Sequence, residues 1–214
     1  MPYKKSSLKV NGFILFWIGA CLLVQGRSAM EIIKSDPTDT ITTLLRGNEG
    51  VFGAPRQGGK THTGVDIVAN QSSNDKNKYR VVAVADGVVA YAKFNGENPG
   101  EGYGYTVIID HQNGTYTLYA HLATLASANL VKVGDPANKG QVLGYMADLA
   151  NGEYSSGNVI AKSVPIYDKI QLHFEEFQAP SGRASTDAIA PIKKNAVILD
   201  PTTDLSSHGY KSAQ

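Results

Sequence analysis

Short β-rich runs with turn residues between them fill the chain from residue 79 to residue 177, and this pattern most limits the fold. The runs lie at 79–85, 88–93, 105–111, 115–121, 141–145 and 169–177. Asp86-Gly87 separates the first two and Gln112-Asn113-Gly114 the next two, and such turns are typical of hairpins. No long stretch has the 3.6-residue apolar period of a helix. The pattern predicts an all-β protein with an antiparallel sheet.

The overall composition favours one domain and argues against a nucleic-acid partner. The chain has 214 residues, of which 42% are hydrophobic, and this is enough for one sizeable core. Its formal net charge is only +1. Beyond the first residues, no run of basic side chains offers a surface for phosphate groups. We therefore expect no nucleic acid among its partners.

The N-terminal segment has the pattern of a secretory signal. Lys4, Lys5 and Lys9 precede the apolar run 13–18, as a positive region precedes the apolar region of a signal peptide. We expect residues 1–28 to be this signal, with a retained membrane anchor as the alternative. Cys21 is the only cysteine.

Cys21 follows Ile18-Gly19-Ala20, which resembles a bacterial lipobox, although the apolar residues 22–24 argue against lipidation. Lipidation and ordinary cleavage both stay open. After cleavage beyond Cys21 the mature chain has no cysteine, so histidines and carboxylates would have to hold any metal.

The run 170–175 is a strand with a chemically distinctive face. Its residues alternate, so Gln171, His173 and Glu175 share one face and the apolar residues between them point toward a core. Such a lone histidine is most often a hydrogen-bonded structural residue.

The segment His62-Thr63-Gly64-Val65-Asp66 adds two further candidate ligands. An imidazole nitrogen and a carboxylate oxygen are both good ligands for zinc. With His173 they would form a tripod that leaves a fourth position for water, as in catalytic zinc sites. In the alternative, Asp66 caps its own turn and His62 stays exposed.

His121 ends a run in which Thr117, Tyr119 and His121 alternate onto one face. If this is the metal face, His121 can hydrogen-bond the attacking water or the oxyanion that forms. The alternative is an exposed histidine at a strand end. We expect no role at the site for His111 and His208.

Taken together, these motifs carry a family resemblance. The segments 62–66, 102–104, 119–122 and 172–175 resemble, in this order, the lysostaphin/LytM-type zinc metallopeptidases, which cut peptide cross-bridges or stems in bacterial cell walls. The similarity runs from Val51 to Phe177.

The resemblance implies an antiparallel two-sheet sandwich of the LytM-like, duplicated hybrid type, with a groove that holds the metal site. It implies Zn²⁺ ligands at His62, Asp66 and His173 and a catalytic histidine at His121. The expected domain division is a lead-in segment at 29–50, the LytM-like peptidase domain at 51–178 and a partly disordered C-terminal extension at 179–214.

One departure from the family pattern affects the catalytic residues. The family's last motif usually begins with a histidine that helps to activate the water, and Gln171 stands at this position. A glutamine amide donates or accepts hydrogen bonds but cannot transfer a proton near neutral pH. Loss of a general acid or base costs about 10²- to 10⁴-fold in rate. Activity is therefore expected to be reduced or altered.

The favoured hypothesis is a secreted zinc metalloendopeptidase that hydrolyses peptide bonds in bacterial peptidoglycan through a zinc-bound water. Its partners would be peptidoglycan peptide stems or cross-bridges, and its location secreted or in the cell envelope. We expect contact with a membrane only if the N-terminal segment is retained or lipidated. The alternative is a catalytically impaired LytM-like domain that binds cell wall or regulates another wall hydrolase. A carrier or carbohydrate-binding β-domain is a third hypothesis.

Overall fold

The computed structural model describes residues 33–34, 43–45, 48–69, 79–95, 102–147, 171–208 and 210–212. The predictions for the signal segment 1–28, for Cys21 and for lipidation lie outside these residues, and the proposed domain division stays a prediction. Within the described parts, no helix is long and apolar enough to cross a membrane.

The described strands form two sheets. The larger sheet has the order β12 (Lys211–Ser212), β2 (Thr43–Leu45), β3 (Val65–Ala69), β10 (Gln171–Gln178), β7 (Thr115–Leu122), β6 (Gly104–Asp110), β5 (Gly87–Asn95) and β8 (Pro136–Ala137), and β11 (Val197–Leu199) also pairs with β10. The smaller sheet has the order β1 (Ile33–Lys34), β4 (Arg80–Val82) and β9 (Val142–Tyr145).

Neighbouring strands are antiparallel, apart from the parallel pair β2 and β12. The predicted all-β, antiparallel class is therefore confirmed. The helical elements are short: η1 (Asn48–Gly50), η2 (Gln57–Gly59), α1 (Thr124–Ser127), α3 (Ala190–Lys193) and α4 (Thr202–Ser207).

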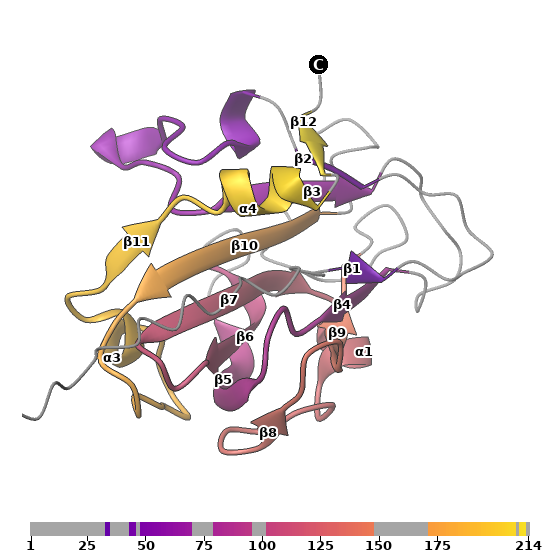
Figure 1. Cartoon of the computed structure of the whole chain (residues 1–214), viewed down its shortest axis with the longest axis vertical. Helices are drawn as coiled ribbons and strands as arrows, with labels where there is room; N and C mark the ends of the chain where they lie inside the picture. The colour runs from indigo at the N-terminus through magenta and orange to yellow at the C-terminus, as the bar shows by residue number, and fades with distance from the viewer. Residues whose placement is uncertain are drawn as a thin grey trace, which may run out of the picture.

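Strand β10 lies at the centre of the larger sheet, between β3 and β7 (Figure 1). Leu172 and Phe174 are fully buried in the main hydrophobic core, as the alternating pattern predicts. The opposite face of β10 is buried as well, because Glu175 is fully covered and Phe177 belongs to a second hydrophobic cluster. Both faces of β10 therefore lie inside the protein.

One of the two predicted hairpins is wrong. Strands β6 and β7 pair across the turn 112–114, as expected. The runs on either side of Asp86-Gly87 do not pair, because β4 belongs to the smaller sheet and β5 to the larger one. Gly87 serves close packing instead of a turn, since a β-carbon there would lie 2.5 Å from the carbonyl oxygen of Asp110.

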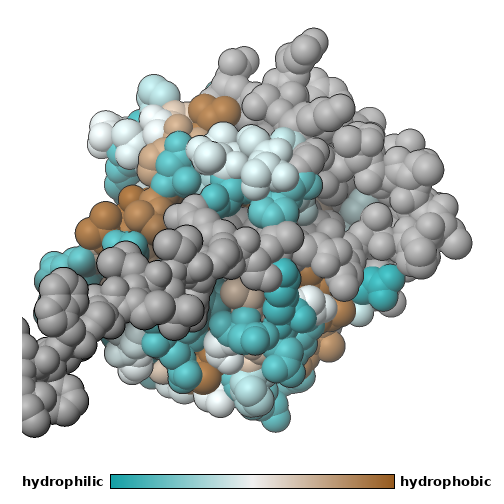
Figure 2. Space-filling view, in the orientation of Figure 1, coloured by the Kyte–Doolittle hydropathy of each residue, from teal (hydrophilic) through white to brown (hydrophobic). Residues whose placement is uncertain are grey.

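The described part of the C-terminal extension packs against the sheet. Ile192 of α3 is fully buried in the second cluster, together with Tyr116 and Phe177. Strand β11 pairs with the end of β10. Its Val197 is 60% exposed, and Figure 2 shows hydrophobic residues at the surface where Figure 1 places β11. The extension therefore covers the face of β10 that carries Phe177.

Replacement of Ile192 by Ala should test this packing. We expect the variant to lose about 2–5 kcal/mol in free energy of unfolding, because a fully buried side chain leaves a cavity. Val197→Ala is the matched control, and we expect it to change stability by less than about 0.5 kcal/mol because Val197 is exposed. Urea unfolding followed by circular dichroism measures both. Equal and small losses would show that α3 does not stabilise the sheet.

Candidate metal centre

A short loop holds His62 beside the larger sheet. The backbone of His62 pairs with two consecutive residues of this loop: its N–H donates to Ala54 O at 2.8 Å, and its carbonyl accepts from Gly53 N at 2.9 Å. The side-chain Nδ1 donates to Val51 O at 2.9 Å. A carbonyl can only accept, so the neutral ring has its lone pair on Nε2, which faces Asp66 and His173.

Strand pairing brings the other two candidate ligands together. Asp66 on β3 lies directly opposite His173 on β10 in the antiparallel register, so their side chains are cross-strand neighbours. Gly64 permits this approach of the loop to β10. A β-carbon at position 64 would lie 2.2 Å from Phe174 O and 2.8 Å from Glu175 Cγ. Any larger residue would push the His62 loop away from His173.

Three ligand atoms converge in this arrangement. His62 Nε2 lies 2.9 Å from His173 Nδ1 and 3.2 Å from Asp66 Oδ1, and the distance from His173 Nδ1 to Asp66 Oδ1 is 3.1 Å. Ligands about 2.0–2.1 Å from a tetrahedral metal lie roughly 3.3 Å apart, so these separations fit one shared ion. All three side chains are buried. His62 is thus not the exposed histidine of the alternative hypothesis.

The charges around His173 stabilise a cation at its position. Burial disfavours the protonated ring, but hydrogen bonds to Asp66 and Glu175 outweigh it and raise the pKa of His173 to about 9. Burial likewise opposes ionisation of Asp66, yet its contacts with the two histidines hold its pKa well below the usual range. Arg56 Nη2 adds a positive charge 3.7 Å from Asp66 Oδ2. A positive charge is therefore favoured between the two carboxylates.

Glu175 supports the far side of His173. Its Oε1 accepts from His173 Nε2 at 3.0 Å and from the Tyr103 hydroxyl at 2.9 Å, and it also bonds the Thr63 hydroxyl. Burial opposes ionisation of Glu175, but His173 and Lys193 lower its pKa to about 2. Glu175 is fully buried, and its contact with Nε2 supports the ring of His173. This contact occupies Nε2 and fixes the ring so that Nδ1 faces His62 and Asp66.

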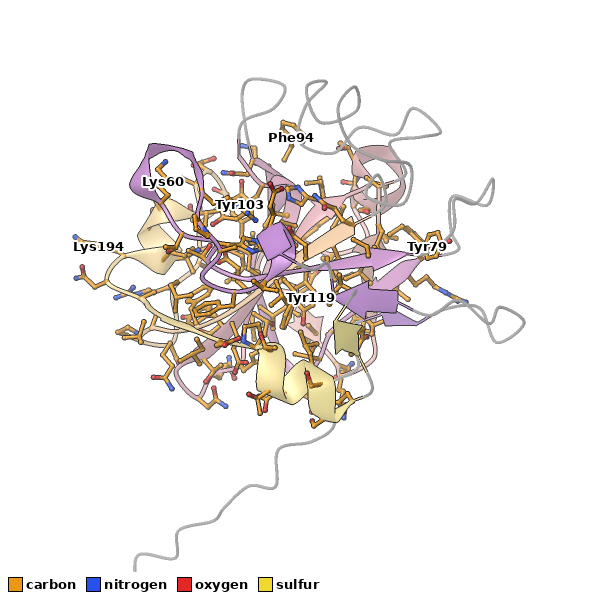
Figure 3. All side chains as sticks on the ribbon, turned by 90° about the horizontal axis from the view of Figure 1, so that it is seen from above. Lys60, Tyr79, Phe94, Tyr103, Tyr119 and Lys194 are labelled. Carbon is orange, nitrogen blue, oxygen red and sulfur yellow. The ribbon has the colours of Figure 1, made fainter. Side chains whose placement is uncertain are left out.

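A cavity of about 780 Å³ opens beside the three ligand atoms, and His121, Gln171 and Tyr103 contribute to its wall. In Figure 3, Tyr103 lies next to the loop that carries Lys60, which also lines the cavity. The structure therefore brings the five predicted site residues, His62, Asp66, His121, Gln171 and His173, to one place.

The side chain of His121 lines the cavity because of a backbone irregularity that strand alternation does not predict. Its φ is +61°, and the pairing of β6 with β7 shifts register between Tyr105 and Val107. Thr117 and Tyr119 share a face, since their hydroxyl oxygens lie 3.1 Å apart, and Tyr119 lies in the core against Phe174. Only the expected placement of His121 on that face is wrong. A bulge adds one residue to a strand and redirects the side chains beyond it.

The electrostatic surroundings of His121 keep its ring neutral. Burial lowers the pKa of His121 to about 4, with a further contribution from the positive charge of His173. The two rings are 5.8 Å apart between centroids. His121 therefore presents one N–H donor and one lone pair at neutral pH.

Several contacts at the site were not predicted from the sequence. Val51 O orients His62, and Thr63 and Lys193 bind Glu175. Thr63 stands within the predicted motif, whereas Lys193 had no signal in the pattern. His111 bonds Asp86 O and Thr117 and is not among the residues that line the cavity.

The chain matches the model of one protein family. Residues 60–178, more than half of the chain, match the description "Peptidase family M23". The chain belongs to peptidase family M23. The matched M23 region contains the three candidate ligands, His121 and Gln171, whereas α3 with Lys193 lies beyond it. The family resemblance inferred from the motifs is thereby confirmed.

Curated relatives of this M23 chain include two named groups of proteins. It is 36% identical over 87 residues to the DD-carboxypeptidase/endopeptidase Mpg of Neisseria meningitidis. The aligned region covers 41% of this chain and 16% of Mpg. It is 26% identical over 175 residues to the cell division protein DipM of Caulobacter vibrioides. The aligned region covers 77% of this chain and 24% of DipM. The chain thus spans a quarter or less of the length of these relatives.

A solved structure supports the fold of this M23 chain. A lytM protein of Ruminococcus gnavus, named as a glycyl-glycine endopeptidase, is similar with a TM-score of 0.52 and 21% sequence identity. The similarity covers 87% of this chain and 62% of the other. At this identity the likeness concerns the fold alone.

The site geometry predicts that metal binding releases a proton. At pH 7 the metal-free His173 is protonated because its pKa is about 9, and a metal must displace that proton from Nδ1. With Zn²⁺ as the probe, we expect release of about one proton at pH 7 and affinity that rises about tenfold per pH unit up to about pH 9. Above that pH the dependence should level off.

Isothermal titration calorimetry in buffers with different heats of ionisation measures this release. His208→Ala is the matched control, since its ring lies in α4's C-terminal turn and bonds Asp204 O, and it should change neither value. Affinity independent of pH between 7 and 9 would contradict the prediction.

Proposed function

We propose that this chain is a zinc-dependent endopeptidase that hydrolyses peptide bonds in bacterial peptidoglycan. The observation that carries the proposal is the convergence of His62 Nε2, Asp66 Oδ1 and His173 Nδ1 within 2.9–3.2 Å of one another at the wall of a cavity. Two imidazoles and one carboxylate are a ligand set typical of catalytic zinc, with a remaining position for water or substrate. Membership in a peptidase family supports the reaction class.

A bound zinc ion supplies a Lewis acid and lowers the pKa of its water toward about 7. The protein's own residues orient the site. Val51 O and Glu175 each hold one ring nitrogen, so His62 and His173 present their other nitrogens without rotation. Asp66 contributes negative charge, which offsets part of the charge of a divalent ion.

Two side chains of the cavity wall are proposed to act on the substrate. His121, neutral at physiological pH, can accept a proton or donate a hydrogen bond to the oxygen that becomes negative during attack. Gln171, buried at 9% exposure, can only hydrogen-bond and orient. Of these two, only His121 can exchange a proton. We propose that His121 stabilises the developing charge and that Gln171 positions the reactants.

The proposal that the substrate is a peptidoglycan peptide is supported by the family and by the names of the relatives. Mpg is named for carboxypeptidase and endopeptidase activity. Such a substrate lies outside the cytoplasmic membrane, which agrees with the signal expected at 1–28. We therefore propose a secreted or cell-envelope location for the domain.

The proposal predicts how four variants digest purified peptidoglycan. Wild type should release soluble peptide fragments and contain about one zinc per chain, whereas Asp66→Ala should lose both. His121→Ala should keep zinc but lose about 10²- to 10⁴-fold in rate. Gln171→His should raise the rate, because it adds a group able to transfer protons. His208→Ala should behave as wild type.

A second candidate function is favoured by one observation, which is Gln171 in the cavity wall. A domain with an impaired site would bind cell wall or regulate another hydrolase, and DipM is named for cell division, not for peptidase activity. If wild type releases no more than Asp66→Ala while Gln171→His does, this alternative replaces the endopeptidase. If zinc is absent from wild type, the proposed metal site itself is wrong.

A further inference from the structure

Lys193 reaches Glu175 from outside the region that matches the family. It is the last residue of α3 (Ala190–Lys193), whereas the family match ends at residue 178. Its Nζ forms an ion pair with Glu175 Oε2 and donates to the Tyr103 hydroxyl at 3.1 Å. The side chain is only 16% exposed. A charge from the C-terminal extension thus enters the buried surroundings of the candidate metal site.

The protein holds this lysine in place from several sides. Its backbone N donates to Ile189 O at 3.1 Å, and the preceding Ile192 is fully buried. The ammonium group lies 5.4 Å from the ring centroid of Tyr103 and 5.7 Å from that of Phe177, which are distances of cation–π contact. Burial of the neighbouring residue and two aromatic rings limit where Nζ can lie.

Glu175 joins this lysine to the metal ligand. One carboxylate oxygen, Oε1, accepts from His173 Nε2 at 3.0 Å, and the other, Oε2, pairs with Lys193. Among the contacts that the structure describes for Glu175, Lys193 is the only permanently charged donor. A fully buried carboxylate is unfavourable without a counter-charge, and Lys193 supplies the one that remains when His173 gives up its proton to a metal.

We propose that Lys193 is a positioning residue for the metal centre, which acts through Glu175 to orient His173 for metal binding. The order of contacts is Lys193 Nζ to Glu175 Oε2, then Glu175 Oε1 to His173 Nε2, with Nδ1 of the same ring facing the metal position. Outer contacts of this kind set ring orientation and ligand strength. The inference rests on the proposed zinc site.

This role makes the C-terminal extension part of the metal centre, not only a cover for the sheet. A purely structural Lys193 would affect folding stability alone. A positioning Lys193 would affect metal affinity, and it would do so only when Glu175 is present. A double-mutant cycle separates these two roles.

The experiment measures Zn²⁺ affinity by competition with a chromophoric chelator for the full chain and its variants. Lys193→Met should weaken binding by about tenfold or more, while Lys193→Arg, which retains the charge, should stay within about threefold of wild type. In a Glu175→Gln background, Lys193→Met should change affinity by less than about twofold. The visible spectrum of the Co²⁺-substituted protein should shift for Lys193→Met, because the coordination geometry changes.

Lys194→Met is the matched control. Lys194 is the next residue, is exposed, and points away from the molecule at its edge in Figure 3. We expect wild-type affinity and an unchanged Co²⁺ spectrum for this variant. Thermal unfolding of each metal-free variant measures the structural contribution separately.

The outcomes separate the two proposals. If wild type binds no Zn²⁺, the proposed function is wrong. If wild type binds Zn²⁺ and Lys193→Met has the same affinity and Co²⁺ spectrum, or loses affinity equally with and without Glu175, the positioning role is wrong. Should Lys193→Met fail to fold, Lys193→Gln takes its place in the same cycle, with the same criteria.

Discussion

Compensation of buried charge is the constraint on which this structure depends. Asp66 and Glu175 are both buried, and neither carboxylate can stay ionised there without positive or hydrogen-bonding partners. His173 lies between them, bonded to Asp66 through Nδ1 and to Glu175 through Nε2. Arg56 and Lys193 face the outer oxygens of the two carboxylates. The alternation of negative and positive groups makes a polar layer tolerable inside an all-β protein.

This layer is compatible with the sheet because β10 separates two environments. Leu172 and Phe174 fill the main core on one side, while Gln171, His173 and Glu175 share the other side with the cavity and the polar layer. Phe177 continues that second side into an apolar cluster under α3. A single strand therefore connects the cavity at one end to the C-terminal extension at the other.

The sequence predicted the site more completely than its surroundings. Period-two alternation placed His173 correctly, and the His62–Asp66 motif supplied partners that strand register brought together. The Asp86-Gly87 hairpin failed because pairing partners depend on contacts between distant residues, which local turn preference does not contain. The contact of Lys193 with Glu175 was not predictable, since α3 spans only four residues and shows no periodic pattern. The direction of the His121 side chain could not be predicted because it depends on a bulge, whereas the alternation rule assumes a regular strand.

At position 121, the left-handed backbone favours glycine, whereas the candidate site needs the histidine. A side chain other than glycine at φ +61° costs about 1–2 kcal/mol, and glycine would remove most of that strain. His121→Gly would relieve the backbone strain but would also remove the imidazole from the cavity wall. A programme to stabilise this domain should therefore hold residue 121 fixed and seek its gains elsewhere, for example at the exposed Val197 of β11.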